Sequence, residues 1–465
     1  MASTCCSLLL GLAGPPAAAT AQGPRLGAIA GFSCVPSVEG PMPTSATSRP
    51  FQALLMPPLP RGWIDQEFFV SCSSPAITYK TSVYVRRPVN AHRASGHVVV
   101  EPLHSGDLFG MLTNVQPYLV AHGDVHVGVA ANSDAVDRLV KPANPSRYAT
   151  LDVPATAAIE NEILAGVGAL LHERSSPLLR DVRVRDAVLG GWSQTTIQVR
   201  DFMAAQSGTA TVDGRRVYDG YYPAQAAVGS TLVAPVPDVG VPVIELEGER
   251  ELLETVRRFA TIGYRRPDSA TYRLYEVPGM AHVTSEPDDP VSSFSRALQC
   301  DRPSGAVQSD FKQTQVWEMA LDNLMTWISR GLPAPHAPRI EVAADGTTVV
   351  RDVNGNARGG VRTTVVDVPT ATIVPTSLNP GGVPGNPCAY IGYQLDFSTQ
   401  KLEELYGTHR QYTAQVAKDA RSLVRGRWLL PDSARHDIVE AARSDVLRGS
   451  DEIPVRASRR PLDQR

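Results

Sequence analysis

The sequence predicts an α/β fold in which a mostly parallel central sheet is flanked by helices. Short β-branched runs alternate along the chain with apolar residues at helical spacing, which is typical of strands connected by crossover helices. Residues 97–100 include three consecutive valines, as expected of a strand buried on both faces of a parallel sheet. The 38 prolines and 37 glycines indicate many turns, which argues against a helical bundle.

The first part of the chain is expected to form a loop-rich lead-in over residues 24–80, since it is rich in proline turns. Three β-branched runs then predict strands at residues 82–85, 97–100 and 125–129. A helix should follow, because one apolar stripe recurs at helical spacing through Ile159, Ile163, Val167, Leu170 and Leu171.

The middle of the chain continues this alternation. Further strands are predicted at residues 182–189, 217–221, 241–246 and 272–277. Helical periods follow two of these strands, at Val199, Phe202 and Met203 and at Leu252, Val256 and Phe259. A last amphipathic helix, which includes Trp317 and Leu321, is expected to end before Gly331 and Pro333.

The character of the chain changes after residue 335. Short strand-like pieces at residues 347–350 and 363–366 lie among Gly, Pro and Asn, and helices are predicted near 399–424 and 431–448. We therefore divide the chain into a core with its lead-in at 24–334 and a C-terminal extension at 335–465 that packs on the core. The lead-in, the loop at 283–315 and the extension are expected to cover the substrate.

Residues 1–21 resemble a signal peptide, because a short apolar core is followed by small residues that suit cleavage after Ala21. No basic residue precedes the apolar core, so a terminal tail is the alternative. This reading predicts a secreted or cell-envelope protein, with a cytoplasmic one as the alternative. No other apolar run approaches the roughly 18 residues of a membrane-spanning helix.

The charge and the cysteines indicate which partners and cofactors to expect. The 44 basic and 47 acidic residues give a net charge of −3 without long runs of one sign, which speaks against a nucleic-acid partner. Four cysteines lie outside the suspected leader, and we expect Cys34 to pair with Cys72 and Cys300 with Cys388. The alternative is four buried free thiols. Their spacing is not that of a zinc site, and we expect no metal and no organic cofactor.

The stretch at residues 188–196 carries the strongest chemical signal. An apolar run ends at Gly191 and presents Ser193 where a strand should turn sharply into a helix. A serine nucleophile needs such a tight turn, and the turn requires a small residue two positions before the serine. Thr195 stands where the common pattern has a second glycine, so the motif is incomplete on its own.

A serine hydroxyl near neutral pH needs a histidine to take its proton and a carboxylate to orient that histidine. His282 follows a predicted strand and a Pro-Gly turn, later in the chain than Ser193. The acid should follow the strand at 241–246, and the spacing after that strand selects Glu251, with Glu249 as the alternative. Glu245 lies within the strand and is set aside.

An oxyanion hole needs two N–H donors aimed at the developing negative charge. The first should be the backbone N–H of Gln194, the residue after the serine. The second should come from the loop after the strand at 97–100, where His104 or a neighbour is the candidate.

The chain resembles the bacterial α/β hydrolase domain-containing family. The resemblance rests on the turn at residues 191–195, which is similar to the family's Gly-x-Ser-Gln-Ser/Thr, and on residues 62–69, 100–103, 147–149, 213–220, 278–282 and 352–362. It implies an α/β-hydrolase fold, an ester-type hydrolase activity, and a Ser-Gln-Thr turn that is a family form. Thr196 departs from the glycine of many relatives, and Glu251 from their aspartate.

These observations together predict a serine hydrolase of carboxylic esters or lactones that works through an acyl-enzyme. Ser193 would be the nucleophile, His282 the base, Glu251 the acid, and Gln194 and His104 the oxyanion donors. The alternatives are a non-catalytic binding protein on the same fold and a serine acyltransferase or peptidase. The partner is expected to be a small-molecule ester or lactone; the sequence leaves the oligomeric state open.

Overall fold

The structure is a computed structural model of the chain. It describes residues 29–34, 36–53, 56–173, 176–226, 234–259, 262–283, 286, 300–377 and 387–449. The predicted signal peptide at residues 1–21 lies outside the described residues.

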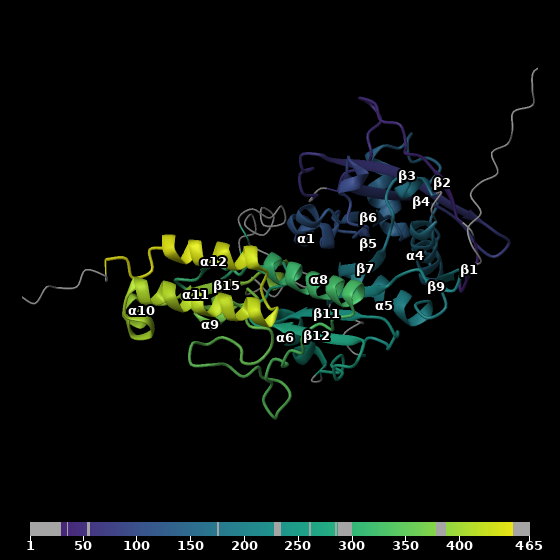
Figure 1. The fold of residues 1–465 in the computed structure, drawn as a ribbon. Coiled ribbons are helices and arrows are strands. Elements are labelled where there is room, and N and C mark those ends of the chain that lie inside the picture. Colours follow the sequence, from purple (N-terminus) through teal and green to yellow (C-terminus); the bar gives the residue numbers. More distant parts are fainter. Residues whose placement is uncertain are drawn as a thin grey trace, which may run out of the picture.

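A nine-stranded sheet forms the centre of the molecule, in the order β12-β11-β10-β7-β5-β6-β4-β3-β2 (Figure 1). Its strands are β2 (Ser37–Glu39), β3 (Trp63–Ser73), β4 (Thr78–Pro88), β5 (His97–Pro102), β6 (Val125–Val129), β7 (Asp186–Ser193), β10 (Gly220–Ala226), β11 (Val243–Gly248) and β12 (Tyr272–Val277). The pairings from β6 to β12 are parallel, and those that join β4, β3 and β2 are antiparallel. The predicted mostly parallel sheet is thus confirmed.

Helices cover both faces of this sheet. They are α1 (Gly110–His122), α4 (Ala157–His172), α5 (Gln194–Ala205), α6 (Glu249–Phe259) and α8 (Gln313–Arg330). Alternate residues of β10 show the two faces: the Tyr222 hydroxyl donates to the Trp317 carbonyl of α8, while the neighbouring Tyr221 ring lies near Phe202 of α5. Helices α1 and α8 share one face, and α4 packs beside α5 on the other.

Some of the predicted elements are wrong. Residues 24–80 are not a loop-rich lead-in throughout, because β3 (Trp63–Ser73) is an eleven-residue strand of the central sheet. Its residues Phe68, Phe69 and Val70 are buried in succession, so it lacks the alternation that marks a half-buried strand. Residues 363–366 do not form a strand: α9 (Thr364–Asp367) is a helical turn, because tertiary packing overrides β-branched propensity.

Two predicted strands are displaced along the chain. The strand predicted at 182–189 is β7 (Asp186–Ser193), and the one predicted at 217–221 is β10 (Gly220–Ala226). Residues 347–350 make only an isolated bridge between Val349 and Val342. The partner strands of β7 and β10 lie far away in the sequence, so local pattern alone does not set the ends of these two strands.

The C-terminal segment packs against the same core. A small antiparallel sheet joins β13 (Val307–Gln308), β14 (Ala371–Val374) and β15 (Tyr393–Asp396), and residues such as Ile340, Ile373 and Ile391 belong to the main hydrophobic core. Helices α10 (Thr399–Tyr406), α11 (His409–Gly426) and α12 (Pro431–Arg443) lie at the end of the molecule away from β2, β3 and β4 (Figure 1).

Short elements complete the described chain. They are β1 (Ile29–Ala30), β8 (Thr211–Val212), β9 (Arg215–Arg216), the helical turns η1 (Ala91–Arg93), α2 (Ser133–Ala135), η2 (Val136–Val140), α3 (Lys141–Ala143), η3 (Pro177–Leu179) and η5 (Pro387–Tyr390). None of the described helices is both long and apolar enough to cross a membrane.

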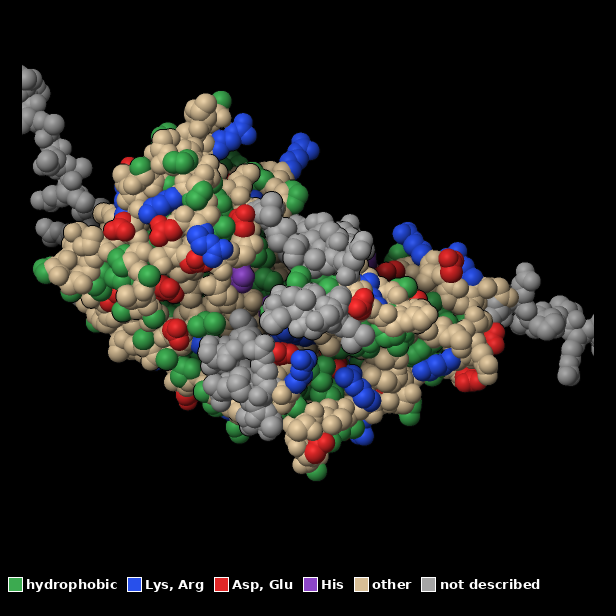
Figure 2. Space-filling model, turned by 180° about the vertical axis from the view of Figure 1, so that it is seen from behind, with side chains coloured by type: hydrophobic (Ala, Val, Ile, Leu, Met, Phe, Trp, Pro, Cys, Tyr) green, Lys and Arg blue, Asp and Glu red, His purple; other side chains and the backbone are tan. Residues whose placement is uncertain are grey.

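The surface carries charges of both signs, and the cysteines are paired. Lysine, arginine and acidic side chains are interspersed on the face that Figure 2 presents. Disulfides join Cys34 to Cys72 and Cys300 to Cys388, which confirms the predicted pairing. The second disulfide attaches the C-terminal segment to the loop that follows β12.

Candidate active site

The turn between β7 and α5 holds Ser193 in an uncommon backbone conformation. Its φ is 57° and its ψ is −120°, a conformation that costs a non-glycine residue free energy and recurs at functional turns. Gly191 makes the turn possible, since a Cβ on it would lie 2.7 Å from the Thr195 carbonyl oxygen. The side chain of Ser193 is largely buried, with 9% of its surface exposed.

Two threonines brace this turn, which explains why a second small residue is not needed. The Thr195 hydroxyl accepts from the Trp192 N–H and donates to the Trp192 carbonyl, both at 2.9 Å. The Thr196 hydroxyl lies 3.0 Å from the Gly191 carbonyl oxygen and 2.6 Å from that of Ala224. Thr195 therefore satisfies backbone groups that a tight turn leaves without partners.

A chain of hydrogen bonds connects Ser193, His282 and Glu251. The Ser193 Oγ lies 2.9 Å from the His282 Nε2, and the His282 Nδ1 lies 2.7 Å from the Glu251 Oε1. Because an ionised carboxylate can only accept, the Nδ1 carries the proton and Nε2 is left to accept from the serine hydroxyl. The second Glu251 oxygen accepts from the Gly248 N–H at 3.1 Å.

The neighbouring carboxylates are occupied elsewhere. Glu249, the alternative acid, pairs with Arg351 at 2.6 Å and accepts from the Gly279 N–H at 2.7 Å. Glu245 pairs with Arg200 at 2.8 Å, and its second oxygen accepts from the Tyr272 hydroxyl. The structure thus places Glu251, and neither of these, against His282.

Burial governs the electrostatics of His282. It lowers the pKa of the imidazole below its ordinary value, while the hydrogen bond and charge of Glu251 raise that pKa and the charge of Arg250 lowers it. The Arg250 Nη1 lies 3.6 Å from the Glu251 Oε1. The Arg250 Cζ lies over the ring of Tyr390, 4.4 Å from the ring centroid. The imidazole is therefore kept neutral and able to accept a proton.

The C-terminal segment reaches this site through Tyr390. The Tyr390 ring lies 5.1 Å from the His282 ring, and its carbonyl accepts from the Val283 N–H at 2.9 Å. Tyr390 ends the turn η5 that the Cys300–Cys388 disulfide holds. Within the predicted covering loop at 283–315, residues 284, 285 and 287–299 lie outside the described residues.

The candidate oxyanion donors lie on both sides of the turn. Gln194 is the first residue of α5, where an N–H has no intrahelical acceptor. Its side-chain oxygen accepts from the N–H of Ser105 at 3.2 Å and also bonds the hydroxyl of that residue, which holds the loop after β5. The backbone N–H of His104, in contrast, donates to the Leu108 carbonyl at 3.1 Å.

Gln225 is a residue that the sequence analysis missed. It is fully buried with a φ of 42°, and its amide donates to the Ala281 carbonyl, next to His282, at 2.7 Å. Its carbonyl oxygen accepts from the Trp192 indole at 3.2 Å and from α8 through Gln313 and Trp317. It thus links the serine turn to the histidine loop, a role that no local pattern signals.

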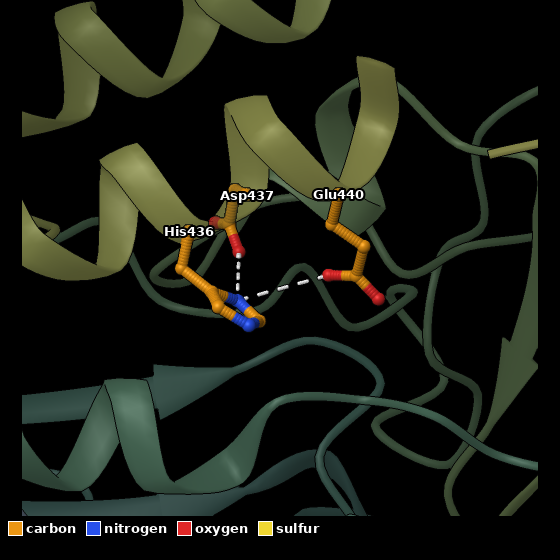
Figure 3. Close-up of side chains that lie close together, drawn as sticks. All are labelled: His436, Asp437 and Glu440. Carbon is orange, nitrogen blue, oxygen red and sulfur yellow. Dashed lines mark ion pairs between the residues drawn. The ribbon is translucent and has the colours of Figure 1, made fainter. Parts of the chain in front are cut away.

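Away from this site, helix α12 carries a cluster of potential metal ligands at His436, Asp437 and Glu440 (Figure 3). The His436 Nδ1 is 4.0 Å from the Asp437 Oδ1 and 3.8 Å from the Glu440 Oε2. The ammonium group of Lys312 already bonds both carboxylates. These residues therefore form an ion-pair network between Lys312, at the N-terminus of α8, and helix α12.

A model of the alpha/beta hydrolase domain family matches residues 38–439 of the chain. Among solved structures, the dienelactone hydrolase of Anabaena variabilis is 15% identical, with a TM-score of 0.31 over 50% of this chain and 95% of its own. Est1E of Butyrivibrio proteoclasticus is 12% identical, with a TM-score of 0.28 over 49% of this chain and 98% of its own.

The rice cell wall degrading esterase LipA of Xanthomonas oryzae is 12% identical, with a TM-score of 0.25 over 35% of this chain and 42% of its own. Comparison with curated proteins finds no match. At these identities and scores, the structural neighbours carry no argument about the substrate.

Proposed function

The chain belongs to the alpha/beta hydrolase domain family, and from this premise we propose that it is a serine hydrolase of carboxylic esters or lactones. One observation carries the proposal: a buried serine on a strained turn lies 2.9 Å from an imidazole whose other nitrogen lies 2.7 Å from a buried carboxylate. This geometry supports transfer of the serine proton to the histidine as the hydroxyl attacks a carbonyl carbon.

In the acylation step, the Ser193 Oγ forms a bond to the carbonyl carbon while its proton passes to the His282 Nε2. The carbonyl π pair moves to oxygen, and Glu251 stabilises the imidazolium through Nδ1. Collapse of the tetrahedral species expels the alkoxide, which takes the proton from Nε2. The product is an acyl-enzyme and a free alcohol, or a tethered hydroxyl if the substrate is a lactone.

In the deacylation step, water replaces the alcohol and gives its proton to the His282 Nε2 as it attacks the acyl carbon. Collapse of the second tetrahedral species breaks its bond to the Ser193 Oγ, which takes the proton from the His282 Nε2, and the carboxylic acid is released. Burial lowers the pKa of the His282 imidazole, which supports this role because the neutral ring is the form that accepts a proton.

The test compares the wild type with Ser193→Ala on a panel of aryl esters and lactones of graded size. We expect hydrolysis by the wild type and a loss of at least ~10³-fold in the variant. A fluorophosphonate probe followed by peptide mapping should label Ser193. Equal rates in both proteins, or a label on another residue, would contradict the proposal, and transfer to an added alcohol would favour an acyltransferase.

We also propose that the protein works in an oxidising compartment, outside the cytoplasm. Two disulfides in the described chain support this location, because such bonds persist in secreted and cell-envelope proteins. Denaturation in iodoacetamide without reductant, followed by mass spectrometry, should leave Cys34, Cys72, Cys300 and Cys388 unmodified. Alkylation of these residues in protein taken directly from the native source would refute the proposal.

A further inference from the structure

We infer that the side chain of His104, through its Nε2–H, is the second donor of the oxyanion hole. The inference rests on the proposed function and replaces the backbone donor expected from the sequence. An oxyanion hole needs two donors, and Gln194 supplies one of them through its backbone N–H.

The loop after β5 has no backbone N–H to spare between residues 103 and 107. Each of these groups already donates to an acceptor within the described structure. The bonds run from Leu103 to the Val129 carbonyl (2.7 Å), His104 to the Leu108 carbonyl (3.1 Å), Ser105 to the Gln194 side chain (3.2 Å), Gly106 to the His104 Nδ1 (2.7 Å) and Asp107 to the His104 carbonyl (3.0 Å). A donor from residues 103–107 must therefore come from a side chain.

The Gly106 bond also determines the tautomer of His104. A backbone N–H can only donate, so the His104 Nδ1 is an acceptor and the neutral ring carries its proton on Nε2. This Nε2 is buried and has no hydrogen-bond partner among the described residues. A buried, unpaired donor costs free energy, and one beside a catalytic site is a candidate partner for a bound ligand.

The His104 ring lies close to both Ser193 and His282, through its contact with Trp192. Its ring centroid is 5.5 Å from that of Trp192, the residue immediately before Ser193, and Trp192 in turn stacks on His282 at 4.9 Å. The Ser105 bonds to the Gln194 side chain hold the loop against the start of α5. The same glutamine thus offers one donor from its backbone and positions the loop that offers the other.

The charge state of His104 suits the reaction. Burial, and secondly the charge of His282, lower its pKa to about 4. It therefore stays neutral while His282 becomes an imidazolium, which avoids two adjacent cations in the transition state. In the attack by Ser193, the carbonyl π pair moves to oxygen, the His104 Nε2–H donates a hydrogen bond to that oxygen, and the imidazole keeps its proton.

Two substitutions separate the two nitrogens of His104. Asparagine places an acceptor near the position of Nδ1, so His104→Asn keeps the Gly106 bond but lacks the donor. Glutamine places an N–H near the position of Nε2, so His104→Gln keeps the donor but lacks the loop bond. We expect His104→Asn to lose about 10²- to 10³-fold in kcat with KM little changed, and His104→Gln to stay within about tenfold of the wild type.

A purely structural role predicts the opposite order, so an active Asn variant and an inactive Gln variant would overturn the inference. The tautomer is measured separately by long-range ¹⁵N–¹H correlation of the wild type, where a proton on the His104 Nδ1 would also overturn it. If the wild type hydrolyses no ester and Ser193 takes no phosphonate label, the proposed function fails and the inference fails with it. If His104→Asn has the kcat of the wild type, the inference about His104 is wrong, while the proposed function still stands.

Discussion

Gly191→Ala tests the turn on which the site depends. The added Cβ would lie 2.7 Å from the Thr195 carbonyl oxygen and 2.8 Å from its carbon, whereas ordinary contacts begin at 3.4 Å. Both atoms belong to the backbone of the turn, so no side-chain rotation relieves the overlap. The turn must open by about 0.7 Å, the difference between these distances.

A shift of this size acts on stability and on catalysis. Overpacking of a buried site costs about 1–3 kcal/mol, and we expect that loss in the free energy of unfolding. Misplacement of a reacting group by ~1 Å costs about 10²-fold, and we expect kcat for an aryl ester to fall by that order. Because the turn opens between β7 and α5, the Ser193 Oγ moves relative to His282, which is held from β12.

Urea unfolding and steady-state kinetics measure the two effects. Gly208→Ala is the matched control, because a Cβ at that position has open space around it and φ lies outside the left-handed region. The control should remain within about 0.5 kcal/mol of the wild type and keep its kcat. If Gly191→Ala matches this control in both measurements, the close approach does not constrain the turn and the reasoning is refuted.

Three further predictions follow from the same site. Glu251→Gln should lower kcat by up to about 10⁴-fold. Glu249→Gln removes the charge of a buried carboxylate whose partner Arg351 is exposed, and it should chiefly lower the free energy of unfolding, by about 1–3 kcal/mol. The reverse pattern would select Glu249 as the acid. Because burial lowers the His282 pKa, the neutral base persists as the pH falls, and the acid limb of kcat/KM should have its midpoint below about 6.5; a midpoint above 7 contradicts this. Thr195→Val should cost about 1–3 kcal/mol in urea unfolding, since it leaves the buried Trp192 N–H unpaired, and Thr195→Ser should restore most of it.

Much of the fold followed from local pattern. The strand at residues 125–129 and the strand at 272–277 were predicted with the ends that the structure gives them, and the helix that ends at Gly331 was also predicted. β3 was missed because its centre is buried on both faces and does not alternate. The helical turn α9 was missed because β-branched residues favour strands until tertiary contacts override them.

In the candidate site too, the features encoded by neighbouring residues were predicted, and the contacts between distant residues were not. Local spacing selected Ser193, His282 and Glu251, because a strand, a tight turn and a helix are encoded by neighbouring residues. The partner of Glu249 was not predictable, since Arg351 is distant in the sequence and reaches it only through folding. Gln225 was not predictable for the same reason, because its partners come from three separate elements.

The sequence by itself determined most of the alternation of strands and helices, the place of the serine turn and the short set of candidate residues for the chemistry. The tertiary structure decided which of these residues touch and which donors remain free. The backbone N–H of His104 is the clearest case: a sequence shows that an N–H exists, but only the folded loop shows that Leu108 has taken it. The loop that brings Leu108 back to His104 is held by bonds from Ser105 to the distant Gln194, and the ring nitrogen left unpaired there is a product of the whole fold.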